Sequence, residues 1–110
     1  MNNIFHTGLE ERWDHFSLPE QMANIGAEVG RTIKWKRKGN LQMSMNALYR
    51  GLELIDLTIN DKKNKNSLKE ILRVREALID YFLGDNIYKS SDIIWEKYFY
   101  YFNLTVRKNY

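Results

Sequence analysis

The chain has 110 residues, with 17 lysines and arginines against 14 acidic residues, a formal charge of +3 and no cysteine. This length suits one domain with a single core, and the lack of cysteine excludes disulfides, thiolate nucleophiles and zinc–thiolate sites. No stretch approaches the roughly eighteen apolar residues of a membrane span and no secretory pattern precedes Phe16, so we expect a cytoplasmic protein without a membrane anchor.

The first helix begins at a capping box. Ser17 is followed by Glu20, and a proline lies in the first turn, where its missing N–H costs nothing. This pattern predicts a helix over residues 18–38. Residues 1–16 are then an N-terminal extension, whose apolar side chains we expect to lie across the bundle, and residues 17–110 form the helical domain.

Small residues form a strip along this first helix. They are Ala23, Gly26, Ala27 and Gly30. A glycine inside a helix costs about 0.5–1 kcal/mol relative to alanine, which indicates that close packing compensates. Either a neighbouring helix of the same chain packs here, or the strip is an interface for self-association.

The most regular periodicity belongs to the second helix, where apolar residues alternate at spacings of four and three. They are Leu41, Met45, Leu48, Leu52, Ile55 and Ile59. The pattern predicts a helix buried over a wide arc, capped by Asn40 and ending near Asn60. The polar tract 61–66 that follows is predicted to be a solvated loop.

Two more helices complete the predicted fold. Ser67 and Glu70 repeat the capping box and open a third helix that ends at Gly84, and either Ser90 or Ser91 caps a fourth. Four helices with short connections predict an all-α, antiparallel four-helix bundle.

The fourth helix is rich in aromatic residues, with six among the eight positions from Trp95 to Phe102. Its core face is predicted to carry Ile94, Trp95, Tyr98, Phe99, Phe102 and Val106. Tyr100 and Tyr101 point away from that face, and we interpret them as interface residues. The alternatives are isolated exposed tyrosines and a surface that stacks nucleobases.

Arg75 lies at the centre of the apolar arc of the third helix. A guanidinium buried there needs a carboxylate partner, and Asp56 is the first choice, followed by Glu28 or Glu53. We interpret the pair as a structural ion pair that fixes helix register. The alternative is an anion or substrate pocket inside the bundle.

A basic cluster ends the first helix. Its members are Lys34, Trp35, Lys36, Arg37 and Lys38. Lys34, Trp35, Arg37 and Lys38 are candidates for contact with nucleic acid through phosphate neutralisation, although cations at a helix C-terminus also complement the helix dipole. The lysines of the tract 61–66 are expected at the opposite pole of the bundle.

No catalytic constellation is recognisable, and we predict neither a metal site nor a cofactor. The serines lack an activating motif, and no phosphate-binding glycine loop occurs. Both histidines, His6 and His15, precede the first helix, so the paired Glu-x-x-His motifs of a di-iron bundle are missing. A ribonuclease of the HEPN type, without its usual arginine–histidine motif, is a remote alternative.

Four segments resemble a family of short, uncharacterised bacterial helical proteins: residues 25–29 (IGAEV), 35–40 (WKRKGN), 52–58 (LELIDLT) and 80–86 (DYFLGDN). The resemblance implies a bacterial origin and a compact helical fold, but no site. In general layout the chain is also similar to the RNA-binding four-helix accessory proteins of diversity-generating reverse transcriptases, which is an analogy of fold alone. We expect a non-enzymatic module that forms a homo-oligomer or docks on a larger protein, with an RNA-binding accessory protein as the alternative.

Overall fold

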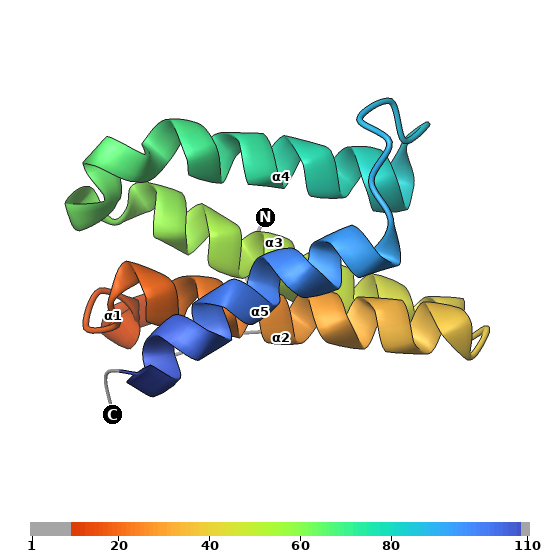
Figure 1. Cartoon of the computed structure of the whole chain (residues 1–110), viewed down its shortest axis with the longest axis horizontal. Coiled ribbons are helices and arrows are strands. Elements are labelled where there is room, and N and C mark those ends of the chain that lie inside the picture. Colours follow the sequence, from red (N-terminus) through yellow and green to blue (C-terminus); the bar gives the residue numbers. More distant parts are fainter. Residues whose placement is uncertain (1–9, 109–110) are drawn as a thin grey trace.

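The computed structural model describes residues 10–108, and all of the regular structure in this range is helical (Figure 1). The long helices are α2 (Leu18–Arg37), α3 (Leu41–Asn60), α4 (Leu68–Leu83) and α5 (Asp92–Lys108), with the short helix α1 (Glu10–Trp13) before them and the 3-10 helix η1 (Lys62–Ser67) between α3 and α4. Figure 1 shows each long helix running back along the bundle in the reverse direction to the one before it. The predicted all-α four-helix bundle is confirmed.

The ends of α2 and α3 follow from local capping. Ser17 Oγ accepts a hydrogen bond from the Glu20 N–H at 3.2 Å, and Glu20 Oε1 accepts one from the Ser17 N–H at 2.8 Å. Asn40 Oδ1 accepts the Met43 N–H at 3.0 Å and starts α3. These side chains satisfy N–H groups that a helix N-terminus leaves without an intrahelical partner, so the predicted starts are confirmed.

Close contact between α2 and α3 forms one half of the core. Four small residues of α3 are buried along this seam: Ser44, Ala47, Gly51 and Thr58. A Cβ on Gly51 would lie 3.4 Å from the Glu28 Cβ, and Ser44 Oγ donates a hydrogen bond to the Thr32 carbonyl at 2.9 Å. Small side chains therefore bring the two helix backbones together.

The polar tract after α3 is not the solvated loop that its composition predicts. It forms η1, and both Asp61 and Asn64 are buried. Gln21 on α2 donates a hydrogen bond to Asp61 Oδ2 at 2.8 Å and accepts one from Asn64 Nδ2 at 2.8 Å. Burying these polar groups costs little free energy because each of them has a hydrogen-bond partner.

Trp13 also belongs to the core, with 1% of its surface exposed. Its indole Nε1 donates to Thr58 Oγ1 at 3.0 Å, and its carbonyl accepts a hydrogen bond from Gln21 at 3.0 Å. Trp13 therefore packs against the bundle, as predicted for the apolar side chains of residues 1–16. The apolar residues predicted at the start of the extension, and His6, lie outside the described residues.

Gly84 ends α4 as predicted, with its backbone extended. Two other predicted details of helix ends and faces are wrong. Ser67 makes no side-chain capping bond, because η1 leads directly into α4. Leu41 and Leu72, both expected on buried arcs, are 69% and 46% exposed because no neighbouring helix covers them.

The long helices do not all pack equally on one another. α5 packs chiefly against α2 and α4 packs against α3, whereas few backbone positions of α4 and α5 come close to one another. Figure 1 shows α5 crossing the bundle obliquely, so that its distance from α4 widens toward the C-terminus. Within the described residues, no helix is both long and apolar enough to cross a membrane.

Candidate interaction surface

The small-residue strip of α2 is where α5 docks. A Cβ added to Gly26 would lie 2.7 Å from the Phe99 Cβ, so only glycine permits this approach of the two helices. Ala23 is half-buried, while Ala27 and Gly30 are exposed. At Gly26 the strip is therefore a contact with a neighbouring helix of the same chain. Ala27 and Gly30 are exposed to solvent and are not covered by α5.

Helix α5 packs on α2 with Trp95 and Phe99 buried, so the opposite face of α5 is exposed to solvent. Five large apolar side chains on α5 are between 40% and 64% exposed: Ile93, Ile94, Tyr100, Tyr101 and Leu104. We call these five side chains the α5 face. Tyr100 and Tyr101 are exposed as the helical phase predicts, whereas Ile94, expected in the core, is 52% exposed because α4 does not reach it.

The size of the α5 face sets it apart from scattered surface residues. Its exposed fractions correspond to about 540 Å² of side-chain surface, taking about 200 Å² for each large side chain when fully exposed. The largest apolar patch of a typical monomer is about 300–600 Å² and is often functional. The α5 face is therefore at the upper end of what a monomer exposes.

Apart from Lys97, which lies beside Glu96, the charges along α5 are separated by sign. Asp92 and Glu96 lie in its first two turns, and Arg107 and Lys108 lie in its last turn. This distribution complements the helix dipole. It also means that a second α5 helix in the antiparallel direction would place acidic residues beside basic ones.

A polar cluster fixes the start of α5 to the ends of α2 and α4. Asp92 Oδ1 accepts hydrogen bonds from the Tyr81 hydroxyl at 2.7 Å and from Lys36 Nζ at 3.0 Å. Arg37 pairs with Asp92 Oδ2 at 3.3 Å and with Glu96 at 3.5 Å. Burial acts to raise the pKa of Asp92, but the hydrogen bonds from Tyr81 and Lys36 outweigh it, so that the pKa lies below its ordinary value.

This cluster divides the basic end of α2 into two parts. Arg37 is engaged by Asp92, so it is not a free cation. Lys34 Nζ lies 5.8 Å and Lys38 Nζ 5.4 Å from the centre of the Trp35 ring, within the range of cation–π attraction. Trp35 with its two lysines thus remains as a small cationic aromatic surface, and Figure 1 places η1 and its lysines at the opposite end of the bundle, as expected.

Arg75 has the partner that the sequence predicts. Its Nε lies 2.8 Å from Asp56 Oδ1. The predicted burial is wrong, because the Arg75 side chain is 35% exposed and the Asp56 side chain is 50% exposed. Glu28, an alternative partner, instead pairs with Arg50 at 3.3 Å. The anion pocket suggested for Arg75 inside the bundle has no counterpart at this exposed position.

The described residues do not gather the groups expected of a metal centre. No cluster of three or more histidine, aspartate or glutamate side chains between residues 10 and 108 is arranged to hold an ion. His15 is exposed.

Comparison with known proteins returns no matching family model, no matching curated protein and no matching solved structure. The resemblance to short bacterial helical proteins therefore stays a prediction.

Sequence patterns identified the two tyrosines of the α5 face but missed Ile93, Ile94 and Leu104. Ile93 carries a usable signal, because it lies about 100° from the core-facing arc. The cluster around Asp92 was missed altogether, since its members come from three helices and share no local pattern.

Proposed function

We propose that the chain is a non-enzymatic interaction module of the bacterial cytoplasm that associates with a second copy of itself through the α5 face. The observation that carries the proposal is the concentration of five large, exposed apolar side chains on one side of one helix. Tyrosine suits such a surface because its rigid ring supplies contact area at low entropic cost.

The charge separation along α5 favours an antiparallel pairing related by a two-fold axis. With the axis near Tyr100 and Tyr101, Glu96 of one copy lies beside Arg107 of the other, and this contact occurs twice. Flanking ion pairs of this kind set the orientation of packed helices. A parallel pairing would instead place like charges together at both ends.

The area of the face predicts a reversible dimer rather than an obligate one. A standard stable interface buries about 800 Å² on each partner, which exceeds the roughly 540 Å² of the α5 face. We therefore expect a dissociation constant in the micromolar range.

The test compares two tyrosine substitutions by light scattering after size-exclusion chromatography. Tyr101→Glu places a charge at the centre of the proposed interface and should give a monomer at concentrations where the unmodified chain dimerises. Tyr49→Glu is the matched control, since Tyr49 is also exposed but lies on α3. Equal effects of the two substitutions would overturn the proposal.

A charge exchange tests the antiparallel register. Glu96→Arg sets two arginines against each other in the homodimer, and Arg107→Glu sets two glutamates against each other, so each variant alone should dimerise less well. A mixture of the two variants restores both ion pairs and should form heterodimers. Heterodimers no stronger than the two homodimers would contradict this register.

A second candidate function is contact with single-stranded nucleic acid at Trp35. The supporting observation is the placement of Lys34 and Lys38 beside its ring, because an aromatic face stacks a base while lysines neutralise phosphates. Binding of oligouridine that weakens with salt and is lost in Trp35→Ala supports this candidate. No binding at low salt would dismiss it.

A further inference from the structure

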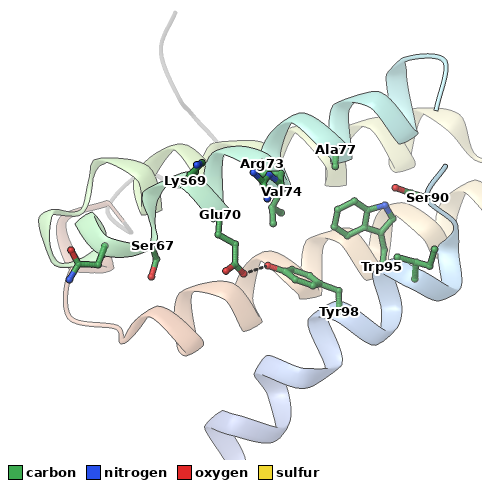
Figure 2. A pocket seen from close by; sticks show the side chains of 11 residues that line it. Ser67, Lys69, Glu70, Arg73, Val74, Ala77, Ser90, Trp95 and Tyr98 are labelled. Atoms are coloured by element: carbon green, nitrogen blue, oxygen red, sulfur yellow. Dashed lines mark hydrogen bonds between the residues drawn. The ribbon is translucent and has the colours of Figure 1, made fainter. Parts of the chain in front are cut away.

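Because the backbones of α4 and α5 come close at few positions, a groove lies between the two helices. Its volume is about 610 Å³, and its lining comes from both helices and from the segments that precede them. Figure 2 shows Val74 and Ala77 on the α4 side facing Trp95 and Tyr98 on the α5 side. Pockets for small molecules are typically about 300–1,000 Å³, so the groove has the size of a ligand site.

The end of the groove near Ser90 contains a polar group without a partner. Trp95 is 5% exposed, and its indole Nε1 is buried with no hydrogen-bond acceptor in the described structure. Figure 2 shows the nitrogen-bearing edge of the ring turned toward α4 and Ser90. A buried N–H without an acceptor costs about 1–3 kcal/mol.

The other end of the groove is cationic. Lys69 and Arg73 are exposed on α4, one turn apart, and neither forms an ion pair with another described residue. The carboxylate in the lining, Glu70, accepts a hydrogen bond from the Tyr98 hydroxyl across the groove at 3.0 Å (Figure 2). The charged lining therefore carries a net positive charge that an anionic group complements.

We propose that the α4–α5 groove binds a small amphiphilic anion, with an apolar body between Ala77 and Trp95 and a carboxylate head at Lys69 and Arg73. The volume favours a molecule of this size over a peptide helix, because a helix about 10 Å across fills such a volume within two turns. Ligand pockets are lined mostly by apolar and aromatic side chains, with a few polar or charged groups that fix the orientation of the ligand, and the two cations of the groove suit a carboxylate in that role.

The experiment measures binding of dodecanoate to the full chain by isothermal titration calorimetry, with dodecanol as the uncharged comparison. We expect micromolar binding of dodecanoate and at least about tenfold weaker binding of dodecanol, since charge-assisted hydrogen bonds to the head group are lost. Failure of dodecanoate to bind, or equal binding of the two molecules, would overturn the proposal.

Substitutions locate the bound molecule. The double variant Lys69→Gln, Arg73→Gln should weaken dodecanoate about tenfold or more, whereas Lys62→Gln, Lys65→Gln removes two cations outside the groove and should leave it unchanged. Ala77→Leu should narrow the groove and weaken binding, while Ala27→Leu, on the exposed side of α2, should not. Equal losses in a groove variant and its control would contradict the assignment.

A final variant separates this site from the proposed dimer. Tyr101→Glu should abolish self-association but leave dodecanoate binding unchanged, since Tyr101 does not line the groove. Loss of binding in that variant would refute a site formed by one chain.

Discussion

Replacing Gly26 with alanine is the sharpest test of how α5 is positioned. The new Cβ would lie 2.7 Å from the Phe99 Cβ and 2.9 Å from the Phe99 Cγ, and real Cβ atoms do not approach so closely. The Phe99 Cβ is attached directly to the backbone, so the ring cannot rotate away from it and α5 itself must shift. Overpacking of this kind costs about 1–3 kcal/mol.

Helix propensity acts in the opposite direction. Alanine is favoured over glycine inside a helix by about 1 kcal/mol, so the net expectation for Gly26→Ala is a loss of up to about 2 kcal/mol in the free energy of unfolding. Gly30→Ala is the matched control, because nothing lies within 4 Å of the added Cβ. That variant should stabilise the chain by about 0.5–1 kcal/mol.

Urea unfolding followed by far-ultraviolet circular dichroism measures both variants. The midpoint should fall for Gly26→Ala and rise for Gly30→Ala. The double variant Gly26→Ala, Phe99→Gly should lose less than the sum of its two single variants, because glycine at position 99 removes the Cβ that the new methyl group meets. A stabilisation by Gly26→Ala equal to that of Gly30→Ala would refute the close approach of α2 and α5.

Three further outcomes follow from the polar contacts. Arg75→Ala should lower the free energy of unfolding in urea by only about 0.2–1 kcal/mol, as for other exposed ion pairs, and a loss above about 3 kcal/mol would indicate a buried pair. Gln21→Leu should cost about 1–3 kcal/mol because Asn64 and Asp61 each lose a buried partner, and a neutral result would contradict the network. Folding lowers the pKa of Asp92, so its carboxylate stabilises the folded chain above about pH 4, and this contribution is lost as the pH falls through the folded-state pKa. The free energy of unfolding should therefore decline less steeply with acid in Asp92→Asn than in the unmodified chain. The same decline in both would contradict the role of Asp92.

Local patterns predicted the helices well because neighbouring residues determine where a helix starts. Ser17 and Asn40 cap with side chains that bond backbone groups three residues away, and such contacts can be read directly from the sequence. The pairing of Arg75 was also predictable, since a cation on a mostly apolar helix face calls for a nearby carboxylate.

Contacts between distant segments were not predictable from local pattern. The tract with Asp61 and Asn64 has the composition of a solvated loop, and its burial depends on Gln21, which lies 40 residues before Asp61. Ile94 has the phase of a core residue, but its exposure depends on how α5 is inclined. That inclination follows from the fit of Phe99 against Gly26, and periodicity along either helix alone does not reveal such a fit.

Sedimentation equilibrium of the unmodified chain tests the proposed self-association most directly. The average mass should rise from that of the 13.2 kDa monomer toward twice that value across the micromolar concentration range, and Tyr101→Glu should remove the rise. A mass that stays monomeric at every concentration, or a dimer that Tyr101→Glu leaves intact, would contradict self-association through the α5 face.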